Sequence, residues 1–437
     1  MQIILLSGGS GKRLWPLSND IRSKQFLKLF RKEDGTYESM IQRVYSELKK
    51  LDKNINVTIA TSKSQVSSIH NQLGDGPNIC IEPCRRDTFP AIILAAAYIY
   101  DVLKCNRSES VVVCPVDPYV DSDYFKELTK LGNIASEGKA NLTLMGIEPT
   151  YPSEKYGYII PENTYMVSSV KEFKEKPDRE TAKKYIDMGA LWNGGVFAFK
   201  LGYILDKAHE LIDFTDYNDL FAKYEKLEKI SFDYAVVEKE QSILVKRFNG
   251  KWKDLGTWNT LVESIDDNII GNAVLDDTSE NVHVVNELDM PILCMGLKNI
   301  IVSASPDGIL VSDKEQSSYI KPYVDKFDDK IMFAEKSWGT YKVIDVGNES
   351  MTIRVELDSG NRMNYHSHNF RDEIWNVIEG SGEIIIDDVV HNANVGDSFY
   401  ISSGVKHTVI ADDRIVLIEV QVGKDISIED KVKHPNI

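Results

Sequence analysis

Apolar runs alternate with amphipathic patterns along the first part of the chain. The runs at residues 2–6, 56–60 and 110–114 are predicted to be buried strands, and the patterns at 39–51 and 90–103 are predicted to be helices. This alternation is typical of a parallel sheet with helices on both faces, whose ligands bind at the carboxyl ends of the strands. We therefore expect an α/β, Rossmann-like domain at the start of the chain.

Strand patterns of another kind fill the rest of the sequence. Segments 141–147, 167–175 and 194–199 interrupt the alternation and predict an insertion within the same domain, so that its sheet is mixed. Short β segments between Gly, Asn, Asp and Pro residues follow, and after Trp338 almost everything has the pattern of short strands and turns. This predicts an all-β barrel or sandwich. The predicted α/β domain, short β connecting unit and C-terminal barrel cover residues 1–268, 269–330 and 331–437.

Length and charge narrow the classes of partner. A chain of 437 residues is too long for one ordinary core, in agreement with several domains. The formal net charge of -16 opposes nucleic-acid binding, which needs clustered Lys and Arg. The N-terminus lacks the features of a signal peptide, the longest apolar run is about half a membrane span, and the five cysteines are dispersed. We expect a cytoplasmic protein with no nucleic-acid or membrane partner.

A glycine-rich segment after the first predicted strand is a candidate phosphate-binding loop. It reads SGGSGKRLWP at residues 7–16. It is not a Walker A loop, because Arg13 stands where Ser or Thr is needed, and Leu14 replaces the last glycine of the dinucleotide fingerprint. Its glycines can still bring backbone N–H groups close to phosphates, and Arg13 and Lys24 add positive charge. For this segment alone, a tight strand-to-helix connection without a ligand is the alternative.

Eight motifs in the same order connect this segment to a known family. Residues 8–16 with 23–26 closely resemble the signature of sugar-nucleotide pyrophosphorylases, especially mannose-1-phosphate guanylyltransferases. The resemblance continues through EPCRRDTFPA (82–91), PVD (115–117), YGY (156–158), FKEKP (173–177), WNGG (192–195), FDYA (232–235) and WKDLGTW (252–258). It implies a nucleotidyltransferase that joins a sugar 1-phosphate to a nucleoside triphosphate and releases pyrophosphate.

The resemblance also implies a role for each group of residues. Transfer to the α-phosphorus brings two anions together, so the protein contributes mainly positioning and charge neutralisation. By resemblance, Asp117 and Asp254 hold Mg²⁺, and Arg13 and Lys24 neutralise the triphosphate. The predicted nucleotide-binding residues are Gly8, Gly9, Ser10, Gly11, Lys12, Arg13, Glu82, Asp87 and Thr88. The predicted sugar-phosphate-binding residues are Gly157, Glu175, Lys176 and Asn193.

Several positions depart from the usual pattern of the family and leave the substrates open. Ser23 stands for Pro, Asp87 for Asn, Phe89 for Ala, and Val116-Asp117-Pro118 for Ser-Asp-His. A carboxylate at Glu82 suits guanine, because it can accept from both N1–H and the 2-amino group, so we expect GTP, mannose 1-phosphate and a GDP-mannose product for polysaccharide synthesis. A transferase that uses CTP or another NTP with a different sugar or polyol phosphate stays open, as does a non-catalytic nucleotide- or sugar-binding protein. For each of Asp117, Lys176 and Glu82 taken singly, the alternative is a structural role as a turn or surface residue.

Histidines at regular spacing mark a second candidate site. The spacing from Gly360 through His366, His368 and Glu373 to Gly380 matches the first cupin motif, and His407 takes its place in the second. Three imidazoles and a carboxylate suit a divalent transition metal such as Zn²⁺, Fe²⁺, Mn²⁺ or Ni²⁺. The alternative is a set of surface or core histidines without a metal.

The barrel sequence further resembles the type II phosphomannose isomerase that is fused to many guanylyltransferases. The resemblance lies in residues 338–341, 371–375 and 418–421 and implies a bifunctional enzyme that also interconverts fructose 6-phosphate and mannose 6-phosphate. Asn364 stands where the isomerase usually has Gln, and its closing Tyr-Gly-Arg is missing. We therefore expect the cupin to bind a metal and to isomerise weakly or not at all. A homodimer is an open option for the whole chain.

Overall fold

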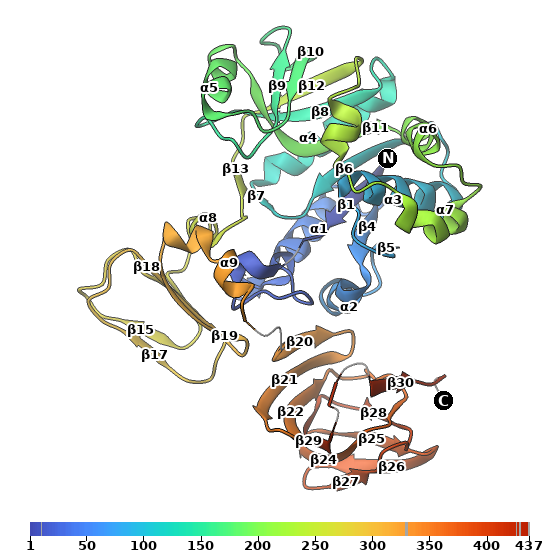
Figure 1. Ribbon diagram of the computed structural model, residues 1–437, viewed down its shortest axis with the longest axis vertical. Helices are drawn as coiled ribbons and strands as arrows, with labels where there is room; N and C mark the ends of the chain where they lie inside the picture. Colours follow the sequence, from blue (N-terminus) through green and yellow to red (C-terminus); the bar gives the residue numbers. More distant parts are fainter. Residues whose placement is uncertain (10, 328–330, 425, 428–429, 436–437) are drawn as a thin grey trace. The chain divides into compact units, whose positions relative to one another are not determined.

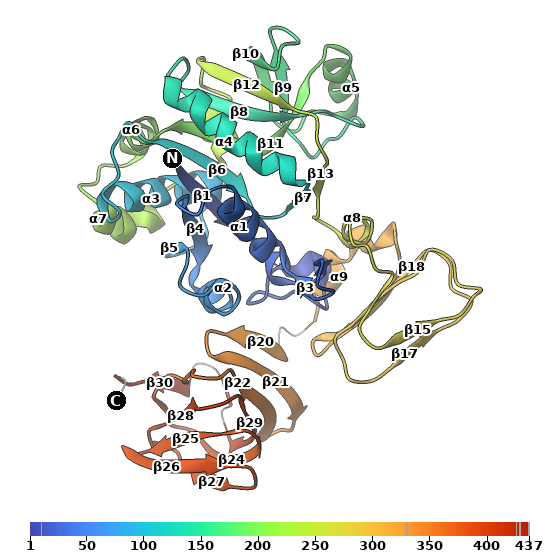
Figure 2. The same ribbon diagram turned by 180° about the vertical axis from the view of Figure 1, so that it is seen from behind.

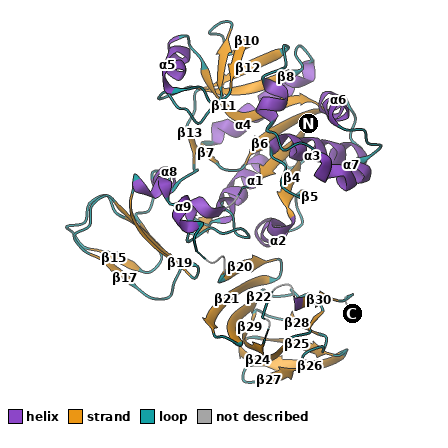
Figure 3. Cartoon of the chain, in the orientation of Figure 1, coloured by secondary structure: helices purple, strands orange, loops and turns teal. Residues whose placement is uncertain are grey.

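The structure is a computed structural model that describes residues 1–437 except residues 10, 328–330, 425, 428–429 and 436–437. By its internal contacts the chain divides into two units. The first consists of Met1–Ser10, Ser23–Val66 and Leu73–Asp267, and the second of Gly11–Arg22, Ser67–Gln72 and Asn268–Ile437. Figure 3 shows helices and strands together in the N-terminal part and mainly strands in the C-terminal part. The predicted division into three domains, with boundaries after residues 268 and 330, stays a prediction.

One mixed sheet forms the centre of the first unit (Figure 1). Its strand order is β5-β4-β1-β6-β11-β8-β12-β10-β9. The strands are β1 (Gln2–Ser7), β4 (Asn56–Ser62), β5 (Asn78–Glu82), β6 (Ser110–Pro115), β8 (Leu142–Ile147), β9 (Tyr158–Pro161), β10 (Val167–Lys174), β11 (Leu191–Lys200) and β12 (Ile243–Phe248). Strands β1, β4, β5 and β6 are parallel, whereas β11 runs antiparallel to β6 and β8. The predicted α/β domain with a mixed sheet is confirmed.

Helices cover both faces of this sheet (Figures 1 and 2). On one face α3 (Thr88–Asp101) packs against β1, β4 and β5, and on the other α4 (Ser122–Glu137) packs against β6, β8 and β11. Alternation along β6 explains the two layers, because Val111 and Val113 belong to the core around α3, whereas a Cβ on Gly132 of α4 would lie 3.1 Å from Val112 Cγ2. The other helices of this unit are α1 (Met40–Leu51), α5 (Arg179–Asp187), α6 (Leu201–Leu211), α7 (Tyr217–Lys223) and α8 (Trp258–Val262), whereas Ser67–Gln72 of α2 (Val66–Leu73) belong to the second unit. No helix among the described residues is both long and apolar enough to cross a membrane.

The two predicted helices begin at polar caps. Ser39 precedes α1, where its Oγ accepts from the Gln42 backbone N–H at 3.3 Å while the Gln42 side chain accepts from the Ser39 backbone N–H at 3.1 Å. Helix α3 begins two residues earlier than predicted, because the Asp87 carboxylate accepts from the Thr88 N–H at 2.7 Å and starts the helix there. Short strand pairs complete the unit: β2 (Phe30–Arg31) with β3 (Tyr37–Glu38), and β7 (Pro118–Val120) with β13 (Trp252–Asp254).

The second unit contains the predicted connecting strands. They are β14 (Ile269–Ile270), β15 (Ala273–Leu275), β16 (His283–Asn286), β17 (Ile292–Cys294), β18 (Ile300–Ser305) and β19 (Gly308–Asp313), followed by α9 (Lys321–Val324). Residues that follow the glycine-rich segment pack with them. Ser305 Oγ donates to the Pro16 carbonyl at 2.6 Å, and the Trp15 and Phe327 ring centroids are 5.0 Å apart.

Two sheets that share one apolar core form the C-terminal barrel. One sheet has the order β20-β21-β22-β29-β24-β27 and the other β26-β25-β28-β23-β30. The strands are β20 (Phe333–Lys336), β21 (Gly339–Val346), β22 (Ser350–Leu357), β23 (His366–His368), β24 (Arg371–Glu379), β25 (Ser381–Ile386), β26 (Val389–Asn394), β27 (Ser398–Ile401), β28 (His407–Ala411), β29 (Ile415–Gly423) and β30 (Lys431–Lys433). Buried side chains from both sheets meet in the core, such as Val355, Trp375 and Leu417 with Ile384 and Val409. The predicted all-β C-terminal barrel is confirmed.

Candidate functional site

Predicted site residues follow the carboxyl ends of parallel strands in the first unit. Gly8 comes directly after β1, Glu82 is the last residue of β5, and Asp117 follows β6. The register pairs Leu6 with Pro115, so that β1 and β6 end side by side. One edge of the sheet therefore carries these residues, as expected for parallel strands.

Lys24 connects two carboxylates at this edge. Its Nζ lies 2.8 Å from Asp117 Oδ2 and 3.9 Å from Asp254 Oδ1. Asp254 is brought there by the β7–β13 ribbon, in which it pairs with Pro118. Desolvation acts to raise the pKa of Asp117, but the Lys24 ammonium outweighs it and holds the pKa below its ordinary value. Two carboxylates that converge on one cation fit Mg²⁺, which prefers a few carboxylates together with phosphate oxygens.

The glycine-rich segment is divided between the two units. Gly9 adopts a φ of 127°, which favours glycine, and its carbonyl accepts from Ser23 Oγ at 3.3 Å. Ser10 lies outside the described residues. Gly11, Lys12 and Arg13 belong to the second unit, where Lys12 Nζ lies 3.3 Å from Asp325 Oδ1.

Glu82 has a tyrosine partner. The Tyr224 hydroxyl donates to Glu82 Oε2 at 2.8 Å. Burial raises the pKa of Glu82, and the Tyr224 hydrogen bond partly opposes that change. The bond orients the carboxylate predicted to read the base.

The four predicted sugar-phosphate-binding residues meet in the structure. The Asn193 N–H donates to the Gly157 carbonyl at 2.8 Å, and Lys176 Nζ lies 2.8 Å from Glu175 Oε1. A Cβ on Gly157 would lie 2.5 Å from Glu175 Oε2 and 2.8 Å from Phe173 Cζ, so a larger residue there would displace these two side chains. Asn193 Nδ2 also donates to Asp233 Oδ1 at 2.6 Å. Asp233 was not among the predicted site residues, although it lies within the FDYA motif that supported the resemblance.

Aromatic rings lie beside both the predicted sugar-phosphate-binding residues and the pair of Asp117 and Asp254. The Tyr156 ring centroid is 4.9 Å from that of Trp192 and 5.5 Å from that of Trp252. Trp192 precedes Asn193, and Trp252 lies on the same strand as Asp254. The two groups therefore border one aromatic cluster.

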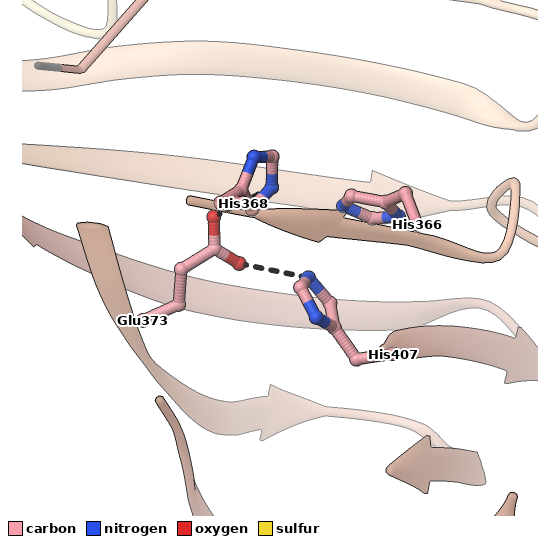
Figure 4. Close-up of side chains that lie close together, drawn as sticks. All are labelled: His366, His368, Glu373 and His407. Atoms are coloured by element: carbon pink, nitrogen blue, oxygen red, sulfur yellow. Dashed lines mark ion pairs between the residues drawn. The ribbon is translucent and has the colours of Figure 1, made fainter. Parts of the chain in front are cut away.

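Four polar side chains converge inside the barrel (Figure 4). The ligand atoms of His366, His368, Glu373 and His407 all lie within 4.8 Å of one another, and all four residues are buried. His368 Nε2 is 3.1 Å from Glu373 Oε1, and His407 Nε2 is 3.3 Å from Glu373 Oε2. The pairing of β23 with β28 places His366 opposite His407. The structure thus brings together the four residues that the cupin spacing singled out.

Backbone carbonyls orient the three imidazole rings. Each Nδ1 faces a carbonyl oxygen: at 2.6 Å from Asn364 in His366, 3.3 Å from Asp430 in His368 and 2.9 Å from Val405 in His407. Because a carbonyl can only accept, each Nδ1 carries the proton and each Nε2 keeps a lone pair. The buried Nε2 of His407 has no hydrogen-bond partner of good geometry among the described residues. This donor set fits a metal ion.

The Arg371 guanidinium contacts two of the four candidate ligands, His368 and Glu373. Arg371 Nη2 lies 3.1 Å from His368 Nε2, and Arg371 Nε donates to Glu373 Oε1 at 3.1 Å. Burial, against the effect of Glu373, lowers the pKa of His368 to about 4, so the ring is neutral near pH 7. A bound metal ion would take the lone pair of His368 Nε2, and Arg371 would keep its hydrogen bond to the Ser427 carbonyl at 2.9 Å.

Comparison with known proteins identifies the family. Residues 2–269 match the nucleotidyl transferase family, and residues 328–435 match the C-terminal domain of mannose-6-phosphate isomerase. The chain belongs to the nucleotidyl transferase family. A mannose-1-phosphate guanylyltransferase from Salmonella montevideo is 30% identical over 98% of both chains. The alginate biosynthesis protein AlgA from Pseudomonas fluorescens is 28% identical over 98% of this chain and 94% of its own. A solved structure from Thermus thermophilus, named mannose-1-phosphate geranyltransferase, has a TM-score of 0.61 and 28% identity, and covers 74% of this chain and 98% of its own.

Two departures of this nucleotidyl transferase from the usual family pattern have structural explanations. Phe89 is buried and lies 5.9 Å from Phe232 between ring centroids, so it fills the core. Asp87 has φ 72° and ψ -176°, a combination that few residues other than glycine adopt, and its carboxylate caps α3 from this position. Thr88 Oγ1 accepts from the Phe232 N–H at 2.8 Å. The contacts that the structure shows for Asp87 and Thr88 are with other residues of the protein. Their contacts with a nucleotide stay predictions.

The raised pKa of Asp233 leads us to predict that the stability of the protein depends on pH. Burial and the neighbouring Glu175 carboxylate raise its pKa from 3.8 to about 7. Between these values the folded protein keeps a proton that the unfolded chain has lost, so the free energy of unfolding falls as the pH rises through this range. Asp233→Asn removes this titration. Its melting temperature relative to wild type should therefore be higher at about pH 8 than at about pH 5.

The matched control is Asp187→Asn, which alters an exposed carboxylate at the end of α5. Its melting temperature should differ from wild type by the same amount at both pH values. The same result for Asp233→Asn would show that Asp233 does not titrate in this range.

Proposed function

We propose that the first unit transfers a guanylyl group from GTP to mannose 1-phosphate, which forms GDP-mannose and releases pyrophosphate. The observation that carries the proposal is the pairing of Asp117 and Asp254 across Lys24 at the carboxyl edge of the sheet. The names of the full-length relatives support the substrates and a role in polysaccharide synthesis.

The chemistry requires two anions to react. A phosphate oxygen of the sugar phosphate attacks the α-phosphorus, and the bond from the α-phosphorus to the bridging oxygen breaks, so that pyrophosphate leaves with the electron pair. Mg²⁺ bound to Asp117 and Asp254 would supply positive charge at the two phosphates. Lys24 neutralises the triphosphate as the charge moves onto pyrophosphate. No covalent nucleophile is needed.

Two further sets of residues would select the sugar phosphate and the base. Lys176 holds the phosphate of the sugar phosphate, while Glu175, Asn193 and Asp233 bond to its hydroxyls. Glu82, oriented by Tyr224, accepts from N1–H and the 2-amino group of guanine. Cytosine presents ring acceptors at the corresponding edge and would leave this carboxylate facing another acceptor.

Loss of either proposed metal carboxylate should slow the transfer. Asp117→Asn and Asp254→Asn are each expected to lower kcat by about two to three orders of magnitude, because the converging phosphates lose a charge-stabilising ligand. The rate is measured as pyrophosphate release at saturating Mg²⁺, with a thermal melt to verify folding. The matched control, Asp123→Asn at an exposed position of α4, should retain the wild-type rate. A near-normal rate in either test variant would remove that residue from the site.

GTP should be the preferred nucleotide, and Glu82 should be the reason. The test is a matrix of four nucleoside triphosphates against a panel of sugar phosphates, read as pyrophosphate release. Glu82→Gln keeps the shape but cannot accept both guanine donors, so kcat/KM for GTP should fall about tenfold or more while that for UTP changes little. A preference for CTP would contradict the guanine assignment. Absence of turnover with every pair would favour a non-catalytic binding protein.

A second function is supported by the barrel. We propose that His366, His368, Glu373 and His407 bind a divalent transition metal, because three Nε2 lone pairs and a carboxylate converge in a buried space. Neutral imidazoles favour Zn²⁺, Fe²⁺, Mn²⁺ or Ni²⁺ over Ca²⁺. Aldose–ketose isomerisation would need a base as well, so the bifunctional alternative requires more than this metal site.

The purified full chain should contain or take up about one transition-metal ion per chain, and His366→Ala with His407→Ala should abolish uptake. Metal content is measured by elemental analysis after reconstitution, and formation of fructose 6-phosphate from mannose 6-phosphate is followed by a coupled assay. We expect weak or absent isomerisation. Robust isomerisation that a chelator stops would contradict that expectation, and a chain that takes up no metal would contradict the ligand assignment. His391→Ala, a histidine on β26 at an exposed position, is the control and should leave uptake unchanged.

A further inference from the structure

Buried polar side chains join the carboxyl ends of β1 and β4 in the first unit. Ser7 ends β1 and pairs in register with Thr61 of β4. Gln65 lies in the short helical turn that follows β4, and its Oε1 accepts from Thr61 Oγ1 at 2.9 Å and from Gln25 Nε2 at 3.3 Å. Gln25 Nε2 also donates to Ser7 Oγ at 3.1 Å. The four side chains form one hydrogen-bond network, and none is more than 1% exposed.

Ser23 extends this network to the glycine-rich turn. Gln65 Nε2 donates to Ser23 Oγ at 2.7 Å, and Ser23 Oγ in turn donates to the Gly9 carbonyl at 3.3 Å. A serine hydroxyl has one hydrogen and also accepts, so it makes both bonds at the same time. The family usually has Pro where Ser23 stands, and a proline side chain could make neither bond. The Gln65–Ser23–Gly9 relay is therefore a feature of this chain.

Packing does not hold the turn that the relay reaches. Gly8 and Gly9 are exposed, and a Cβ on either would meet no atom of the described residues within 4 Å. Glycine has more conformational freedom than any other residue, and Gly9 uses it with a φ of 127°. The hydrogen bond from the buried Ser23 hydroxyl restricts a backbone that packing does not restrict. The open space beside the two glycines leaves room for a phosphate.

We propose that Gln65 and Ser23 are positioning residues for the triphosphate. The relay fixes the Gly9 carbonyl, and with it the N–H groups of the turn, relative to Lys24, which directly follows Ser23. Backbone N–H groups of such turns and lysine ammonium groups bind phosphate oxygens. Groups that are already ordered lose less freedom when the ligand binds. The inference rests on the proposed function for the identity of the ligand, and neither positioning residue touches it.

The test is calorimetric titration of the full chain with GTP and with inorganic pyrophosphate, both with Mg²⁺. Ser23→Ala removes the central hydroxyl of the relay and should weaken the binding of both ligands about five- to tenfold, because a hydrogen bond that orders the turn is lost. In the rate assay the KM for GTP should rise by a similar factor, while the KM for mannose 1-phosphate and the melting temperature change little. A purely structural role for Ser23 would not raise the KM for one substrate alone.

Thr58→Val is the matched control. Thr58 is a fully buried threonine of the same strand β4, and its Oγ1 has no hydrogen-bond partner among the described residues. The substitution removes a buried hydroxyl outside the relay and should leave both affinities unchanged. An equal loss of affinity in Thr58→Val and Ser23→Ala would overturn the inference.

A double-mutant cycle tests whether Gln65 and Ser23 act together. Gln65→Leu keeps the approximate size of the side chain but removes its polar atoms. Ser23→Ala combined with Gln65→Leu should weaken GTP binding by less than the product of the two single effects, because both substitutions interrupt one relay. Multiplicative effects would overturn the relay, as would equal affinities of Ser23→Ala and the parent chain. If Gln65→Leu does not fold in a thermal melt, the comparison of Ser23→Ala with Thr58→Val decides.

Binding without turnover separates this inference from the proposed function. A chain that binds GTP or pyrophosphate but transfers no guanylyl group overturns the proposed function, and the comparison of the variants still decides the inference. A chain that transfers the group, with unchanged affinities in Ser23→Ala, overturns the inference alone. A chain that binds neither ligand overturns both.

Discussion

Parallel pairing of β1 with β4 and β6 is the constraint on which the transferase site depends. Parallel strands end at the same edge of a sheet, so the loops after β1 and β6 and the end of β5 emerge together. The register of β1 against β6 then places the start of the glycine-rich segment beside the approach to Asp117. A shift by one residue would turn Val111 and Val113 from one helical layer towards the other, and the apolar core around α3 therefore maintains the register.

In both units a cation contacts the carboxylates of the candidate site. Lys24 bridges Asp117 and Asp254, and Arg371 contacts Glu373 and His368 in the barrel. A carboxylate withdrawn from water needs such partners, because desolvation opposes its ionised form. For the proposed phosphate and metal ligands, such oriented groups would need little further reorganisation on binding.

Local patterns predicted the elements better than their polar contacts. The apolar runs of the parallel strands and the apolar positions of α1 and α3 follow from side-chain burial, which depends on near neighbours. The start of α3 was placed too late because the capping residue Asp87 adopts an uncommon φ that no local pattern announces. Phe89 was a departure from the family motif in the sequence, and only its packing against Phe232 gives it a structural reason.

The sequence by itself determined the fold class, the reaction class and the four residues that converge in the barrel, because strand periodicity, motif order and cupin spacing are properties of short segments. The tertiary structure alone decided which distant groups touch. It joined Asn193 to Asp233, 40 residues away, and Gln65 to Ser23, 42 residues away. Contacts of this kind depend on strand register and sheet order, which arise from the packing of the whole unit and which no short segment of the sequence specifies.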